Sequence, residues 1–478
     1  MAVTASPTDV LHSGLAESEP GGEFSSRAAA EAYIGKVCFK QGPPLLIGAE
    51  LEWLTAQGEL SATNSRPDLK VLADALGPHA PRSISPDSPA VPLPGGSRVT
   101  IEPGGQIELS SAPFGTAAEL CERLRTDTMR LRELLESRAI RTFSGAADAV
   151  RRPSRVLRLP RYRAMERSFA GIGPFGALMM CNTAATQVSV DAGADPTEIA
   201  ARWRVLHAVG PALLAAFACS PELHSAPPGE WASQRMRAWQ RLDHLRTRPP
   251  LHDWADPVTG YARWALDVPL LCVRPRAAPA QSNRSGAAPR NRLAAVPLDR
   301  AKASRPNRLR SAPSSSDAAD WSAPPGATFA DWLCGALDEE IGRRPDRTDL
   351  DYHLTTVFPP VRAAGHLEVR YLDAQPGDGW SVPIHVFDAL LSSPEIVTEA
   401  TALAASTADA WSEAARLGLA DPQLRAAAVS LLELATAHAP TPQAVKELAA
   451  AAGRCRRGRP PGEGDYPTPG EGESRGGA

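Results

Sequence analysis

The sequence has no excess of positive charge and no apolar run long enough to cross a membrane. Its 478 residues include 51 Lys plus Arg and 54 Asp plus Glu, a formal net charge of −3. Because the chain has no overall positive charge, we do not expect nucleic acid as a partner. The longest apolar stretch, residues 209–219, is about half of what a bilayer requires. The N-terminus resembles no signal peptide, so we expect a cytoplasmic protein without a membrane partner, for which a monomer is plausible.

The sequence also has few cysteines, no glycine-rich phosphate-binding loop and no internal repeat. Its seven cysteines are widely spaced and include no Cys-x-x-Cys pair. A disulfide framework or a structural zinc site is therefore not expected, and a reducing compartment is favoured. With 43% hydrophobic residues, the chain can still bury a large core.

Three stretches without apolar periodicity divide the chain. Residues 1–26 and 454–478 are rich in small and polar residues and predict disordered tails. Residues 275–325 are rich in Arg, Ala, Pro and Ser and predict a disordered insertion. Its arginines could contact RNA, but no aromatic residues alternate with them, so a solvated linker is favoured. The remainder, 27–453, predicts a single domain.

Within this domain, strand and helix patterns alternate irregularly. Period-two alternation and β-branched residues predict strands, and long amphipathic stretches predict helices. The strands come mainly as hairpin-like pieces, which favours an α+β fold with helices packed on one side of an antiparallel sheet. The predicted strands span 44–56, 97–113, 181–193 and 366–374, and the predicted helical patterns span 116–139, 196–220 and the Ala/Leu-rich region from about 384 to 452.

Paired glutamates stand out in the first predicted strand. Glu50 and Glu52 are two residues apart, so they share one face of the sheet while Ala49 and Leu51 share the other. Adjacent carboxylates repel unless a positive charge lies between them, and hard oxygen ligands suit Mg²⁺. The alternative is a solvent-facing edge that carries two ordinary glutamates.

A second pair of glutamates flanks a predicted turn. Glu102 and Glu108 lie on either side of Pro103-Gly104-Gly105, which is typical of a hairpin connection. An odd number of loop residues would place both glutamates on one face, and an even number would place them on opposite faces. The alternative is an exposed hairpin with solvated polar positions.

A third setting combines acidic and basic residues. Glu368 and Arg370 share one strand face, with Val369 on the other, which suits a site that handles both a metal and an anion. The alternative is a structural ion pair. His353 and Thr355 could line the same cleft, although a lone histidine is more often a packing residue.

Further arginines surround Trp239. Arg235, Arg237, Arg241 and Arg246 follow a pattern that any exposed helix could show. Arg161 and its neighbour Tyr162 present the same ambiguity. Strand glutamates that bind metal ions, together with arginines, are typical of a site that neutralises phosphate groups.

Several segments, in order, resemble the glutamate-cysteine ligases of the plant and proteobacterial type, and within them the actinobacterial branch that serves ergothioneine synthesis. The resemblance covers roughly residues 45–395. The insertion at 275–325 departs from the family pattern, and Leu54 stands where relatives often have a lysine. The matching segments are IGAELEWL, VTIEPGGQIELSSAP, MMCNTAATQVSVD, SQRMRAWQRLD, YARWALDVPL and TDLDYHLTTVFPPVRAAGHLEVR.

The resemblance implies a ligase domain over 27–453, similar to the catalytic domain of glutamine synthetase, whose curved antiparallel sheet forms a funnel. The implied reaction uses ATP and Mg²⁺ to join the γ-carboxylate of glutamate to the amine of cysteine through a γ-glutamyl phosphate. Implied metal ligands are Glu50, Glu52, Glu102, Glu108 and Glu368. Arg370 would act with Glu368 on the transferring phosphate, Arg235 and less strongly Arg246 would bind glutamate, and His353 and Thr355 would lie near the nucleotide.

Two other functions stay open at this point. One is a related carboxylate-amine ligase with another amine acceptor, and the other is an inactive homologue that binds glutamate or a nucleotide. The second predicts lost carboxylates, yet all five are present. We expect Glu50→Ala or Glu368→Ala to abolish turnover without unfolding the protein.

Overall fold

The computed structural model describes residues 22, 24, 26–58, 65–143, 145–248, 256–275 and 321–462. The predicted N-terminal tail lies almost entirely outside these residues. Most of the predicted insertion and the end of the predicted C-terminal tail also lie outside them.

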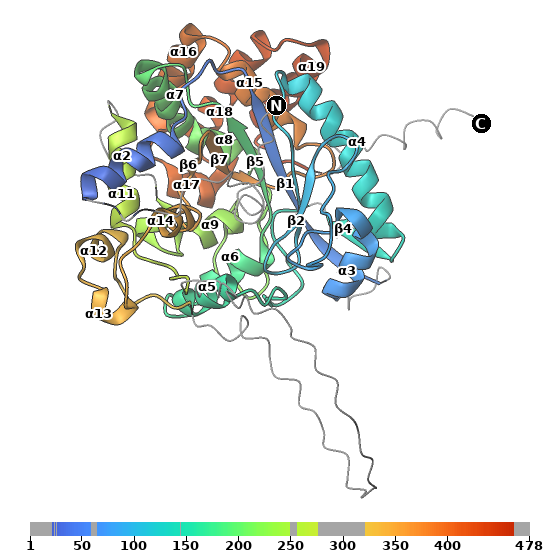
Figure 1. Cartoon of the computed structure of the whole chain (residues 1–478). Helices are drawn as coiled ribbons and strands as arrows, with labels where there is room; N and C mark the ends of the chain where they lie inside the picture. Colours follow the sequence, from blue (N-terminus) through green and yellow to red (C-terminus); the bar gives the residue numbers. More distant parts are fainter. Residues whose placement is uncertain are drawn as a thin grey trace, which may run out of the picture.

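Seven strands form one antiparallel sheet at the centre of the described chain (Figure 1). Six follow the order β2-β3-β1-β5-β7-β6, and β4 pairs with the last four residues of β1. The predicted α+β fold with an antiparallel sheet is confirmed. The strands are β1 (Ile47–Gln57), β2 (Arg98–Ile101), β3 (Ile107–Ser110), β4 (Ile140–Phe143), β5 (Ala185–Val190), β6 (Val361–Ala363) and β7 (Leu367–Asp373).

Helices surround this sheet. Those before the insertion are α2 (Arg27–Cys38), α3 (Leu69–Leu76), α4 (Ala117–Glu136), α5 (Pro160–Ala170), α6 (Phe175–Asn182), α7 (Pro196–Ala208), α8 (Gly210–Phe217), α9 (Gln234–Gln240), α10 (His244–Thr247) and α11 (Pro257–Asp267). Those after it are α12 (Phe329–Cys334), α13 (Asp338–Ile341), α14 (Arg347–Leu354), α15 (Ser381–Leu390), α16 (Pro394–Ala404), α17 (Trp411–Leu417), α18 (Pro422–Ala437) and α19 (Pro442–Arg456).

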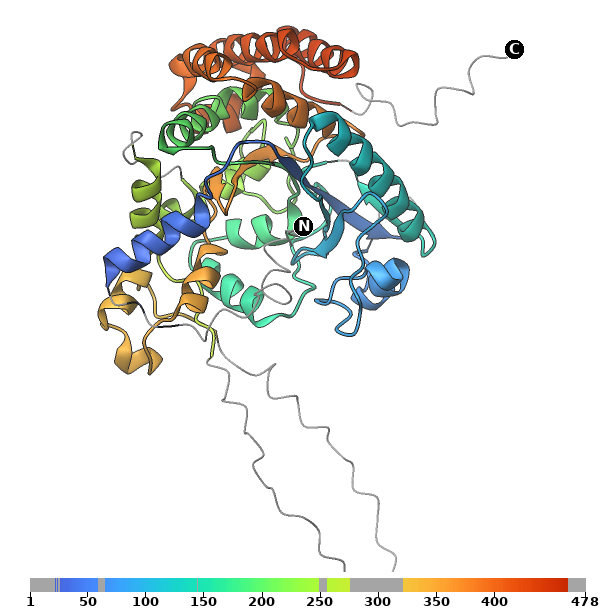
Figure 2. The same cartoon turned by 45° about the horizontal axis from the view of Figure 1, so that its top comes forward.

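The two faces of the sheet differ in chemistry. Leu51, Val188 and Val369 are buried and belong to the main hydrophobic core. Helix α15 contacts β5, helix α8 contacts β7, and α16, α18 and α19 extend this helical layer (Figures 1 and 2). The alternate residues carry carboxylates and arginines and face the other way, toward α5, α6 and α9. The sheet therefore separates an apolar core from a polar cavity.

Proline positions explain why the predicted long helices are divided. The expected helix 196–220 breaks between α7 and α8, where Pro211 has no amide hydrogen to donate to the preceding turn. Within 384–452, Pro394, Pro422 and Pro442 each stand at the first turn of a new helix. The expected strand 181–193 is shorter than predicted, because residues 181–182 complete α6 and only 185–190 form β5.

Two predicted disorder boundaries are corrected by packing. Helix α19 continues to Arg456, and both Arg454 and Cys455 are buried, so the C-terminal tail does not begin at 454. Near the other boundary, Trp321 stacks edge-on against Tyr352 with ring centres 5.6 Å apart, and Ser322 pairs with Cys272. Residues 321–325 therefore belong to the folded domain.

All seven cysteines are unpaired thiols. In the part of the chain that the structure describes, no helix has both the length and the apolar character of a membrane span.

Candidate active site

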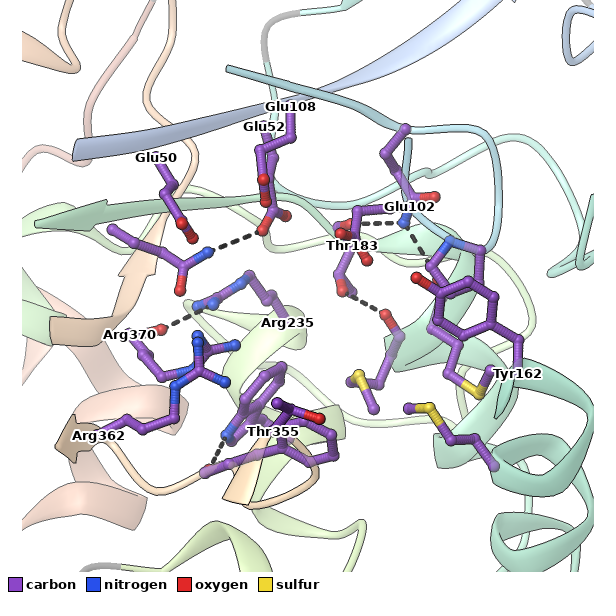
Figure 3. A pocket seen from close by; sticks show the side chains of 18 of the residues that line it. Glu50, Glu52, Glu102, Glu108, Tyr162, Thr183, Arg235, Thr355, Arg362 and Arg370 are labelled. Carbon is purple, nitrogen blue, oxygen red and sulfur yellow. Dashed lines mark hydrogen bonds between the residues drawn. The ribbon is translucent and has the colours of Figure 1, made fainter. Parts of the chain in front are cut away.

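The polar face of the sheet forms one wall of a cavity whose other walls come from α5, α6, α9 and the segment after α14 (Figure 3). Its charged lining residues are Glu50, Glu52, Glu102, Glu108, Arg161, Arg235, Arg362 and Arg370. The uncharged ones include Gln106, Tyr162, Met165, Met179, Met180, Thr183, Gln187, Trp239, Thr355 and Phe358.

Strand register brings three of the glutamates together. Glu52 in β1 lies directly opposite Glu108 in β3, and Glu50 lies opposite Gln187 in β5. Residues in direct register point to the same face of an antiparallel sheet. The prediction that Glu50 and Glu52 share a face is therefore confirmed, and Glu108 joins them from the neighbouring strand.

The β2–β3 hairpin adds the fourth glutamate. Ile101 pairs with Ile107, so residues 102–106 form a connection with an odd number of residues. Glu102 and Glu108 consequently face the same side. Gly105 has a φ of +86°, which suits a glycine at the end of such a turn, and a side chain at Gly104 would collide with the backbone of Cys181. The Pro-Gly-Gly sequence thus fixes how Glu102 enters the cavity.

Neutral groups hold the glutamates in place. Thr100 and Ser110 donate hydroxyl hydrogen bonds to Glu108, at 2.5 and 2.9 Å. The carboxylate of Glu52 accepts from the Ala185 amide at 2.8 Å and from the Gln187 side chain at 3.1 Å. Among the described residues, no arginine forms an ion pair with any of the four cavity glutamates. This wall therefore carries carboxylates that lack a cationic partner.

Burial and mutual repulsion make these carboxylates hard to ionise. Burial raises the pKa of Glu52 to about 6, that of Glu102 to about 7 and that of Glu108 to about 8. The pKa of Glu50 also lies well above its usual range, first because of burial and then because of Glu108 and Glu368. A bound cation would relieve this repulsion.

The arginines Arg362 and Arg370 come from β6 and β7, at the other end of the same sheet, and one buried glutamate holds both of them. This part of the lining, with Arg235 of α9, is called the basic wall, and the part that carries the four glutamates is called the acidic wall. Arg362 donates to Glu368 from Nε at 2.7 Å and from Nη2 at 3.1 Å, and Arg370 donates to the same carboxylate. Although burial by itself would raise it, these arginines keep the pKa of Glu368 down at about 2.

The position of Glu368 differs from its predicted role. Its carboxylate does not line the cavity, and both of its oxygens accept hydrogen bonds from arginine. The geometry therefore supports a positioning role for Glu368, which orients Arg362 and Arg370, rather than direct metal ligation. The prediction that Glu368 and Arg370 share a strand face agrees with the register of β7.

Trp239 links the remaining cavity arginines. The guanidinium carbons of Arg235 and Arg370 each lie 5.5 Å from the centre of its ring. Arg235 also donates to the backbone carbonyl of Arg370 at 2.7 Å, and the indole of Trp239 donates to the Phe358 carbonyl at 3.0 Å. Arg235, predicted to bind substrate, thus lies beside Arg370 in the cavity (Figure 3).

Two predicted site residues lie outside the cavity. Arg246 is buried and donates to the backbone carbonyls of Thr356 and Pro269 and to the Asp243 carboxylate, so its guanidinium has no free direction toward a substrate. His353 is also buried, and its Nε2 lies 2.8 Å from the Ala265 carbonyl oxygen. The structure does not bring these two predicted site residues into the cavity; their side chains contact the backbone of neighbouring segments instead.

Thr355, in contrast, lines the cavity as predicted. Its hydroxyl accepts a hydrogen bond from Arg161 at 2.9 Å, and a second nitrogen of Arg161 donates to its carbonyl oxygen at the same distance. This pair fixes Arg161 at the edge of the cavity.

Sequence reasoning missed several cavity residues. Gln187 lies within the predicted strand 181–193, two positions beyond Ala185. The alternation of this strand could have indicated which of its residues share a face with Gln187. Arg362 pairs with Glu368 across the β6–β7 hairpin, which the sequence alone did not reveal. The side-chain oxygens of Gln106 and Gln187 are buried without a hydrogen-bond partner in the described chain. Such orphaned acceptors are expected where a ligand binds.

The carboxylate wall fits Mg²⁺ bound in its usual manner. In the described chain, no three carboxylate, histidine or cysteine side chains are arranged to enclose one ion. Mg²⁺ is commonly held by one or two carboxylates, with water and substrate phosphates as its other ligands. Glu50, Glu52, Glu102 and Glu108 offer carboxylate oxygens of this kind to the cavity.

Comparison with known proteins identifies the family. Residues 46–462 match glutamate-cysteine ligase family 2 (GCS2). The chain belongs to this family.

Two EgtA relatives support the assignment by sequence. The glutamate-cysteine ligase EgtA of Mycolicibacterium smegmatis is 36% identical over 422 residues, which cover 87% of this chain and 86% of the relative. EgtA of Mycobacterium tuberculosis is 34% identical over 423 residues, covering 88% and 85%. A crystal structure of the Francisella tularensis glutamate-cysteine ligase in complex with AMP is 12% identical, with a TM-score of 0.46 over 87% of this chain and 82% of that chain.

Proposed function

We propose that the cavity joins the γ-carboxylate of glutamate to the amine of cysteine, with ATP converted to ADP and phosphate. The observation that carries the proposal is the separation of charge. Four glutamates that form no ion pair with any described residue lie across the cavity from the arginines of β6, β7 and α9 (Figure 3). This arrangement suits a reaction in which a polyphosphate and a carboxylate must approach each other. Family membership and the two EgtA relatives supply the choice of glutamate and cysteine.

The chemistry requires ATP because an amine does not displace oxygen from a carboxylate at a useful rate. Phosphorylation of the γ-carboxylate gives a γ-glutamyl phosphate, the cysteine amine attacks its carbonyl carbon, and phosphate leaves. Both steps need negative charge to be neutralised and the reacting atoms to be aligned. Arg370 and Arg362 have the charge for the transferring phosphoryl group, and Arg235 has the charge for a carboxylate of glutamate.

Mg²⁺, bound with ATP by Glu50, Glu52, Glu102 and Glu108, would supply charge neutralisation for the phosphates. The raised pKa values of these carboxylates support this role, because a cation favours their ionised forms. Two relatives bear the name glutamate-cysteine ligase EgtA, and the sequence motifs resemble the branch that serves ergothioneine synthesis. We therefore assign the chain to ergothioneine biosynthesis.

The test is ADP release by the purified protein with ATP, Mg²⁺ and glutamate, while the amine acceptor is varied among cysteine, 2-aminobutyrate, ammonia and other amino acids. We expect release that depends on glutamate and is fastest with cysteine, and mass spectrometry should identify γ-glutamylcysteine. A different best acceptor would reassign the chain to a related carboxylate-amine ligase. No release from folded protein would favour a glutamate- or nucleotide-binding regulator.

A further inference from the structure

A second cavity, with no lining residue in common with the first, lies behind α9. Its volume is about 1050 Å³, at the upper end of the range for sites that bind small molecules. Helices α7, α9, α10, α16 and α17 contribute to its walls. Neither the proposed reaction nor the family resemblance assigns it a role.

The floor of this cavity is apolar. Met236, Ala208 and Ala408 line it, together with the ring of Trp411. That ring is held edge-on against Tyr371 with ring centres 5.3 Å apart, and a side chain at Gly210 would collide with it. The indole is therefore fixed in orientation and presents a rigid aromatic surface to the cavity.

The rim of the cavity is cationic. Arg241, His244 and Arg248 are exposed, and their side chains form no hydrogen bond or ion pair with any described residue. Asp409 is the one acid among the described lining residues. Guanidinium groups form strong charge-assisted hydrogen bonds with anions, so Arg241 and Arg248 above an apolar floor favour an anion that also carries an apolar part.

We propose that this cavity is a second ligand site, for a small molecule that combines a flat aromatic ring system with a phosphate, sulfonate or carboxylate group. The ring would lie on Met236 and Trp411, and the anionic group would reach Arg241 and Arg248.

An occupant of this site would contact the back of the catalytic wall. Arg235 and Trp239 of α9 line the first cavity, whereas Met236 and Gln240 of the same helix line the second. Gln240 also donates to the Trp411 carbonyl at 2.9 Å. Pro360 lines the second cavity, and its carbonyl accepts from the amide of Arg370 at 2.9 Å. The two sites are thus coupled through α9 and the segment 358–360.

Anilinonaphthalene sulfonate, a fluorescent aromatic anion, tests the site. We expect the full-length protein to bind one equivalent in the presence of saturating ATP and glutamate. The Arg241→Ala/Arg248→Ala variant should bind at least roughly tenfold more weakly. The matched control Arg123→Ala/Arg138→Ala makes the same change of charge on exposed positions in and just after α4 and should bind as the wild type does.

A second variant tests the floor without changing the charge. Ala408→Trp should fill the cavity and abolish probe binding, whereas Ala402→Trp, on the exposed side of α16, should not. Unchanged binding in Arg241→Ala/Arg248→Ala or Ala408→Trp would overturn the proposal. Equal loss in the matched controls, or displacement of the probe by ATP and glutamate, would also overturn it.

The coupling has its own measurement. Saturating probe should change the KM for glutamate more than twofold in the wild type and should leave it unchanged in Ala408→Trp. An unchanged KM in both would overturn the coupling through α9. Because probe binding needs no turnover, these outcomes are distinct from a failure of the proposed ligase reaction.

Discussion

The two walls of the catalytic cavity contain opposite charges and reach stability in different ways. Among the described residues, Glu50, Glu52 and Glu108 accept hydrogen bonds only from neutral groups, and burial raises their pKa values. Arg362 and Arg370, in contrast, are already paired with the buried Glu368, whose pKa is about 2. Without a ligand, the carboxylates of the acidic wall therefore repel one another when ionised. The charges of Arg362 and Arg370, in contrast, are already neutralised in part by Glu368.

This difference separates the residues that matter for turnover from those that also matter for folding. A carboxylate on the acidic wall can be removed without breaking an ion pair. Removal of Glu368 leaves two arginines without their shared anion. The expectation from sequence that Glu50→Ala and Glu368→Ala behave alike therefore needs revision.

The largest effect is expected from the acidic wall. Glu50→Ala should lower kcat by on the order of 10³-fold, because a ligand for the cation that neutralises the transferring phosphate is lost. Its melting temperature should equal or exceed that of the wild type, because one repelling charge is gone. Steady-state ADP release and differential scanning fluorimetry check the two parts. A variant with wild-type turnover would contradict the metal-site assignment.

Glu368→Gln should affect both turnover and folding. The free energy of unfolding should fall by about 3–5 kcal/mol, because two buried guanidinium groups lose their shared charged partner. Urea denaturation measures this loss. Adding Arg362→Met should restore part of the stability but not turnover. An unfolding midpoint like that of Glu50→Ala would remove the distinction between the walls.

The glutamates of the acidic wall should determine how the stability of the folded protein changes with pH when nucleotide and divalent cation are absent. Glu102 and Glu108 have folded-state pKa values of about 7 and 8, above the ordinary value of 4.5. The folded state therefore holds protons more tightly than the unfolded state, and stability should fall as pH rises from about 5 to 8.

Glu108→Gln provides the control for this trend. It should flatten the decline and stabilise the protein at pH 8 by on the order of 1–2 kcal/mol, because it removes a buried charge. Melting temperatures measured with EDTA across this range check the prediction. A wild-type melting temperature that rises with pH would contradict the raised pKa values.

The smallest effect is expected where the arginines stack. Trp239→Leu removes the aromatic face next to Arg235 and Arg370, an interaction of about 0.5–1 kcal/mol at each cation. The KM for glutamate should rise several-fold while kcat changes less. Trp264→Leu, a largely buried position outside the cavity, is the control for lost volume. An equal change of KM in both variants would show that packing, not stacking, is responsible.

Local periodicity allowed much of the site to be predicted. Residues two apart on a strand share one face, which predicted that Glu50 lies beside Glu52 and that Glu368 lies beside Arg370. The observed strand register agrees with both predictions. The hairpin sequence located Glu102 and Glu108 but left their relative faces open, because loop length depends on how the strands pair. The motifs also identified the ligase family correctly.

Other features depended on contacts between distant segments. Arg246 and Arg235 look alike in the sequence, yet one is buried against backbone carbonyls and the other lies beside Arg370. His353 contacts Ala265, almost ninety residues earlier in the chain. No local pattern distinguishes a buried structural cation from a substrate-binding one.

The sequence by itself determined which residues share a strand face and the family to which the chain belongs. These features follow from local geometry and from motifs that are continuous in the chain. Only the tertiary structure decided that Glu368 serves two arginines and that Trp239 lies beside Arg235 and Arg370. It also decided that Arg241 and Arg248, whose side chains have no partner among the described residues, lie at the rim of a second cavity. Each of these depends on strands and helices far apart in sequence, whose distances are fixed only when the core packs.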